Sequence, residues 1–134
     1  MIKRVAIGTL SLMLLDVMWL GVLMKSFYRQ HLAPIAMTAP DGSLSPNWIA
    51  IAPVYLLIAI GLAKFVIPRT SSPASVALSG AVFGFVVFGV YDLTNFATLR
   101  DYSLTFTAVD MLWGFATCGI TAVVMMTIGS AKSS

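Results

Sequence analysis

The sequence of 134 residues contains no glutamate, one cysteine, one histidine and few charged residues of either sign. Only 10% of its residues are charged, against about 25% in typical soluble domains, and 59% are hydrophobic. This composition excludes a disordered chain, a coiled coil and an ordinary soluble domain. The lone Cys118 excludes a disulfide framework. The lone His31 leaves a histidine metal site or a Ser/His/Asp triad without partners, so we expect no metal site.

The net charge of +3 does not indicate nucleic-acid binding, because the basic residues are not gathered in one stripe. They lie instead at the ends of long apolar stretches, where their side chains can reach lipid headgroups. We therefore expect a lipid bilayer as the partner and no nucleic acid. The basic residues are Lys3, Arg4, Lys25, Arg29, Lys64, Arg69, Arg100 and Lys132.

Four apolar stretches are long enough to cross a membrane, at about 5–24, 46–67, 73–99 and 104–128. At 1.5 Å per residue, about 20 helical residues cross a hydrocarbon core of roughly 30 Å. The sequence therefore predicts an all-α polytopic membrane protein, with four transmembrane helices in an antiparallel bundle and one domain over residues 1–134. The first stretch has the basic start of a signal peptide. Its length, Asp16 and the lack of a small-residue cleavage site before Lys25 indicate a retained helix.

Local signals refine these helices. Ser45-Pro46 and Ser72-Pro73 each combine an N-cap residue with a proline suited to the first helical position. Pro53 predicts a kink in the second span. Gly80 and Gly84 have the GxxxG spacing that lets another helix approach closely.

The distribution of lysine and arginine predicts the orientation. With four crossings both termini lie on one side, and placing them inside puts five basic residues in the cytoplasm and three outside. We therefore expect an N-in/C-in topology. The longest connection, about 26–44, and the short turn at Arg100-Asp101 then lie outside.

Three of the five acidic residues, Asp16, Asp92 and Asp110, fall inside predicted spans. A central intramembrane aspartate costs about 2.5–3.5 kcal/mol on the mildest scale, and such residues usually face the bundle interior and mark function. From the helix rise, these acids lie about 13, 10 and 9 Å below the outer boundary, and Tyr55 about 12 Å below it. All four spans therefore offer a polar group at one depth.

Spacing on the helices extends this group. Each acid has a polar or aromatic residue three positions later, on the same helical face. On the fourth span, Thr107, Gly114, Thr117 and Thr121 continue the face of Asp110. We predict a cavity in the outer half of the bilayer that binds an ion or ligand. Its residues are Asp16, Trp19, Tyr55, Asp92, Asn95, Asp110 and Trp113.

The same polar residues also allow a purely structural interpretation. Aspartates that hydrogen-bond to hydroxyl and amide groups can hold helices together without any other function. Trp19 and Trp113 can equally be packing residues. Tyr28, Trp48 and Tyr102 have the positions of an interfacial aromatic belt.

Short motifs in all four spans are similar to those of a bacterial family of four-span inner-membrane proteins, defined by domain of unknown function 2177. The resemblance covers nearly the whole chain and implies a multi-pass protein of the bacterial inner membrane. It implies no activity, cofactor or catalytic residue. The first external loop, around 40–45, is longer than the family pattern. The motifs are LDVMWLG (15–21), FYR (27–29), NW with a downstream YLL (47–57), YDLTNFATL (91–99) and VDMLWG (109–114).

The sequence leaves three classes of function open. The first is a protein that binds a small cation, a proton or an amphiphilic ligand and that also transports it if the site opens to both sides. Because four spans enclose little volume, transport is expected to need a homo-oligomer. The second is a membrane-embedded enzyme that acts on a lipid or isoprenoid through two carboxyl groups. The third is a non-catalytic scaffold subunit in which the acids only lock the helices together.

Overall fold

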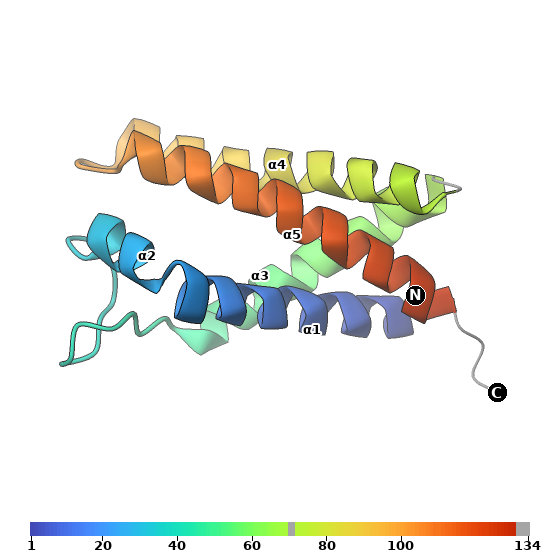
Figure 1. Ribbon diagram of the computed structural model, residues 1–134, viewed down its shortest axis with the longest axis horizontal. Coiled ribbons are helices and arrows are strands. Elements are labelled where there is room, and N and C mark those ends of the chain that lie inside the picture. The colour runs from blue at the N-terminus through green and yellow to red at the C-terminus, as the bar shows by residue number, and fades with distance from the viewer. Residues whose placement is uncertain (70–71, 131–134) are drawn as a thin grey trace.

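The computed structural model describes residues 1–69 and 72–130 and shows an antiparallel bundle of four long helices with one short helix at one end (Figure 1). Four segments are long and apolar enough to cross a membrane, which confirms the predicted all-α, four-span membrane bundle. The helices are α1 (Ile2–Met18), α2 (Lys25–Leu32), α3 (Trp48–Gly61), α4 (Pro73–Thr98) and α5 (Leu104–Ser130). A π-helical turn, Trp19–Leu23, extends α1, and a second, Leu62–Val66, extends α3 and leads into a 3-10 turn, Ile67–Arg69.

The helix starts follow the local capping chemistry. α4 begins at Pro73, and the Ser72 side chain accepts from the backbone N–H of Ser75, as the sequence predicts. α3 begins at Trp48 instead of Pro46. Asn47 caps it by accepting from two backbone N–H groups, and asparagine is as good an N-cap as serine. The first and last helices start or end two to three residues beyond the predicted spans.

The tightest packing lies between α4 and α5, where small residues let the two backbones approach. A Cβ atom added at Gly80 would lie 2.8 Å from the carbonyl oxygen of Cys118, and one added at Gly84 would collide with the carbonyl oxygen of Gly114. This confirms the close approach predicted from the GxxxG spacing. The same approach brings the acidic residues of the two helices together.

The start of α1 and the end of α5 lie at one end of the bundle, which we call the terminus end; the opposite end, with α2, is the α2 end (Figure 1). Arg4 on α1 donates a hydrogen bond of 3.0 Å to the hydroxyl group of Ser130 on α5. The predicted topology puts the terminus end inside and the α2 end outside. Lys132, which contributes to that prediction, lies outside the described residues.

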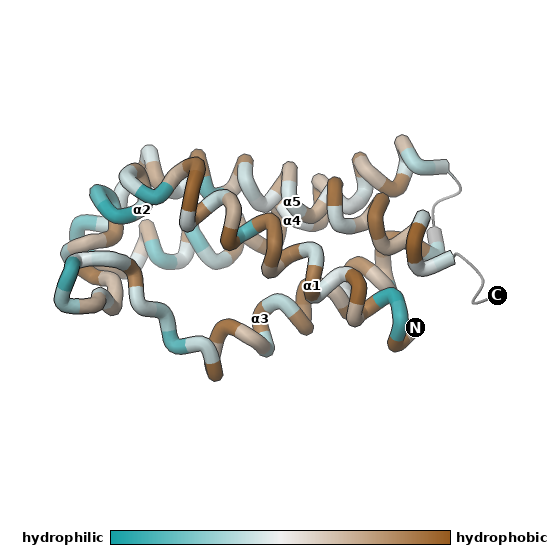
Figure 2. The backbone as a smooth tube through the Cα atoms, turned by 60° about the horizontal axis from the view of Figure 1, so that its bottom comes forward, coloured by the Kyte–Doolittle hydropathy of each residue, from teal (hydrophilic) through white to brown (hydrophobic). Residues whose placement is uncertain are grey.

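Hydrophobic residues cover the lipid-facing sides of the spans, while hydrophilic residues gather in the loops of the α2 end (Figure 2). Inside, an apolar core runs from the middle of the bundle toward the terminus end, and a smaller aromatic cluster closes the α2 end. The core includes Leu12, Leu62, Val66, Val76, Ala122 and Met125, and the aromatic cluster consists of Tyr28, Tyr102 and Phe106. Polar side chains occupy the layer between these two regions.

The α4–α5 contact gives a direct test. Gly84→Ala is expected to lower the free energy of unfolding by about 1–3 kcal/mol, because the added methyl group forces the two helices apart. Thermal unfolding in detergent micelles measures the change. Gly21→Ala is the matched control, since a Cβ atom there meets nothing within 4 Å. Equal melting temperatures for the two variants would contradict the packing described here.

Candidate functional site

Asp92 on α4 and Asp110 on α5 form a pair of neighbouring carboxyl groups. Asp92 is 0% exposed and Asp110 is 9% exposed. Each accepts a hydrogen bond from a tyrosine: Oδ1 of Asp92 from the hydroxyl group of Tyr102 at 2.9 Å, and Oδ1 of Asp110 from that of Tyr28. Oδ2 of Asp92 has no donor among the described residues.

The third acid, Asp16 on α1, has its own partners. Its Oδ1 accepts from the indole N–H of Trp113 at 2.7 Å, and the hydroxyl group of Tyr55 on α3 also donates to it. Asp16 therefore ties α1 to both α5 and α3. It does not share a hydrogen bond with the other two acids.

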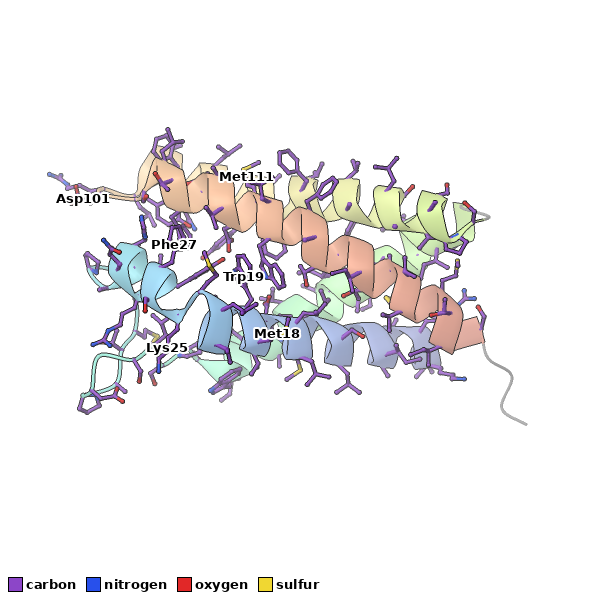
Figure 3. All side chains as sticks on the ribbon, in the orientation of Figure 1. Met18, Trp19, Lys25, Phe27, Asp101 and Met111 are labelled. Carbon is purple, nitrogen blue, oxygen red and sulfur yellow. The ribbon has the colours of Figure 1, made fainter. Side chains whose placement is uncertain are left out.

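Two stacked indole rings connect Asp16 to the carboxyl pair. Trp19 and Trp113 lie parallel, with ring centroids 4.3 Å apart and planes inclined by 1°. The indole N–H of Trp19 donates to the hydroxyl oxygen of Tyr28 at 2.9 Å, and Tyr28 donates in turn to Asp110. Figure 3 shows Trp19 between α1 and α5. Trp19 opens the π-helical turn, a local widening of the helix that is frequent at functional sites.

Asn95 on α4 adds one more contact beside the carboxyl pair, because it hydrogen-bonds to the hydroxyl group of Tyr102. One polar network thus links all four spans, and we call it the carboxyl network. It brings together all seven residues predicted from the sequence; their roles in binding stay predictions. In order of contact it contains Tyr55, Asp16, Trp113, Trp19, Tyr28, Asp110, Asp92, Tyr102 and Asn95.

The sequence predicts that Tyr28 and Tyr102 lie in an interfacial belt, and this prediction is wrong. They are only 3% and 8% exposed, whereas Trp48, the third expected belt residue, is 58% exposed. Tyr28 reaches Asp110 because the chain breaks at Met24, where φ is −122° and ψ is 18°, so that α2 packs over the bundle end. Asp101, with φ at 62°, shapes the turn that carries Tyr102. Neither tyrosine shares a helical face with an acid, so spacing could not identify it.

Tyrosine and tryptophan side chains donate hydrogen bonds to the acids at the place where the sequence predicts a cavity, and the cavity itself stays a prediction. Two apolar grooves, of about 540 and 280 Å³, lie on the lipid-facing side of α4 and α5 and contain none of the three acids. No group of three His, Cys, Asp or Glu in the described parts of the chain is arranged to hold a metal ion.

The tyrosines at the α2 end are held as hydrogen-bond donors. Burial raises the pKa of Tyr28 well above its usual value of about 10, and the neighbouring Asp110 raises it further. Burial likewise raises the pKa of Tyr102, with a further increase from Asp92. On the exposed loop before α3, hydrogen bonds from Ser43 lower the pKa of Asp41.

Removing one hydroxyl group tests the network. Tyr28→Phe is expected to destabilise the protein by about 1–3 kcal/mol, because the N–H of Trp19 loses its acceptor and Asp110 loses a donor. Thermal unfolding in micelles and tryptophan fluorescence report the loss. Tyr91→Phe is the control, because Tyr91 is exposed on α4. If the two variants unfold alike, Tyr28 has no role in holding the site.

The same tyrosines predict a loss of stability in alkali. A hydroxyl group whose pKa is higher in the folded than in the unfolded state adds stability that is present below about pH 10 and is lost as the pH rises further. Denaturant unfolding in micelles from neutral to strongly alkaline pH should show this decline. The decline should be shallower in Tyr28→Phe than in Tyr91→Phe, and identical slopes would contradict the assignment.

Comparison with known proteins supports the membrane assignment. The model of a protein family described as "Predicted membrane protein (DUF2177)" matches residues 1–127. Searches of curated proteins and of solved structures gave no match. Because the family model spans nearly the whole chain, the match includes the first three membrane spans, nearly all of α5 and every residue of the carboxyl network. The chain therefore belongs to the family of multi-pass membrane proteins defined by domain of unknown function 2177.

Proposed function

We propose that this membrane protein binds a proton between Asp92 and Asp110. One observation carries the proposal: Oδ2 of Asp92, in a fully buried carboxyl group next to Asp110, has no hydrogen-bond donor in the described part of the chain. A carboxylate only accepts hydrogen bonds, so two carboxylates cannot satisfy each other. One shared proton supplies the missing donor.

The electrostatics of the pair favour the same state. Two like charges in contact and away from water repel each other strongly, and carboxyl pairs of this kind hold one proton between them. The tyrosines complete the arrangement, because each donates to the Oδ1 atom of one acid.

The surroundings of the pair argue against a larger ligand. Side-chain donors from Tyr28 and Tyr102 contact the acids directly, and the apolar grooves on α4 and α5 contain neither acid. A small metal ion usually needs four or more ligands, and Asp16 is engaged by Trp113 and Tyr55. Among the ligands expected from the sequence, the proton therefore fits best.

Exchange of this proton is expected from the α2 end. α2 carries Tyr28 over Asp110 and is joined to α1 through the π-helical turn and the break at Met24. Under the predicted N-in/C-in topology this end faces the outside of a bacterial inner membrane. The proton would then enter from the outside as α2 moves.

Infrared difference spectroscopy of the protein in lipid tests the proposal. The wild type should show a protonated carboxylic acid band at neutral pH that shifts in deuterated water. Asp92→Asn and Asp110→Asn should each remove intensity, because the new amide N–H supplies the donor and leaves the other acid ionised. Both variants are expected to stay folded for the same reason.

Asp41→Asn is the control, because Asp41 is exposed and its lowered pKa keeps it ionised at neutral pH. Its spectrum should match that of the wild type. The proposal fails if the wild type has no such band, or if neither Asp92→Asn nor Asp110→Asn reduces it. In that case the acids act only as links between helices.

A further inference from the structure

Two hydroxyl groups on α5 are buried without a partner. Thr117 and Thr121 are both 0% exposed, and their Oγ1 atoms have no hydrogen-bond partner among the described residues. A hydroxyl group removed from water without a hydrogen bond costs free energy. The burial of two such hydroxyl groups one helical turn apart therefore needs a physical explanation.

Other threonines in these helices satisfy their hydroxyl groups on their own backbone. Each donates to the carbonyl oxygen four residues earlier, at 2.5–2.9 Å, as is common for threonine in a helix. Thr117 and Thr121 do not make this bond, so their hydroxyl groups stay available in the bundle interior. The threonines bonded to their own helix are Thr9, Thr94, Thr98, Thr107 and Thr127.

The two hydroxyl groups continue the line of the carboxyl network toward the terminus end. Asp110, Thr117 and Thr121 are seven and four residues apart and therefore share one face of α5. Along the helix axis, Thr117 lies about 10 Å and Thr121 about 16 Å from Asp110. This face enters the apolar core, to which the neighbouring α5 residues Cys118, Ala122 and Met125 belong.

We infer that Thr117 and Thr121 bind water molecules that carry protons between Asp110 and the terminus end of the bundle. Buried water typically bridges polar groups that lack partners, and two hydroxyl groups one turn apart are spaced for it. In each step an oxygen accepts a proton and releases another to its neighbour, so no charge stays behind. The inference rests on the proposed proton site and extends it from binding to conduction.

Met125 marks the place where this path closes. Its side chain is 0% exposed and packs against Gly8 on α1, where an added Cβ atom would lie 2.5 Å from the Met125 sulfur atom. Met125 lies one turn beyond Thr121. A flexible thioether side chain at this point can move aside without disturbing the helices.

Proton flux into proteoliposomes under an imposed membrane potential tests the inference, with a pH-sensitive dye inside the vesicles. Thr117→Val/Thr121→Val keeps the shape of both side chains but removes the hydroxyl groups, and its flux should fall by at least about tenfold. Thr117→Ser/Thr121→Ser should conduct like the wild type. Thr127→Val is the matched control, because Thr127 is exposed and its hydroxyl group is bonded to Val123.

The infrared band of the carboxyl pair, recorded on the same samples, separates this inference from the proposed function. If the band is present but the double valine variant conducts like the wild type, or the wild type does not conduct, the inference is overturned and the proton site stands. If the band is missing, the proton site itself fails. Should the double variant not fold, each single valine variant serves instead, and each is expected to lower the flux.

Discussion

The structure depends on one constraint: acidic side chains inside a membrane bundle must find hydrogen-bond partners from other helices. Asp16, Asp92 and Asp110 meet it with donors from tyrosine and tryptophan side chains. These donors come from different segments, so satisfying the acids fixes how α1, α3, α4 and α5 are placed. Around this polar layer, apolar packing fills the bundle toward the terminus end and aromatic packing closes the α2 end.

Close helix packing and irregular backbone serve the same network. The glycines between α4 and α5 let the two helices approach, which brings Asp92 into contact with Asp110. The π-helical turn begins at Trp19, whose ring stacks on Trp113, and the break at Met24 turns α2 back over the bundle. These departures from a regular helix occur where the polar side chains have to meet.

Most of the network was visible in the sequence, because charged residues in an apolar span are rare and helical spacing shows which neighbours share their face. That reasoning identified Asp92 with Asn95 and Asp110 with Trp113. It missed Tyr28 and Tyr102, since they lie in a short end helix and a turn, where periodicity carries no information about contacts. It also did not show that these two tyrosines donate hydrogen bonds to the acids, because the sequence does not reveal which side chains meet in the bundle interior.

The sequence by itself determined the solvent and the number of spans. Each of these follows from composition and the fixed rise of a helix, which are local properties. Only the tertiary structure decided which donor reaches which carboxyl group and that Asp92 lies next to Asp110 while Asp16 has other partners. It also decided that two threonine hydroxyl groups have no partner among the residues that the structure describes. These outcomes depend on the rotation of each helix and on the path of the chain at α2, and both are set by contacts between residues far apart in the sequence.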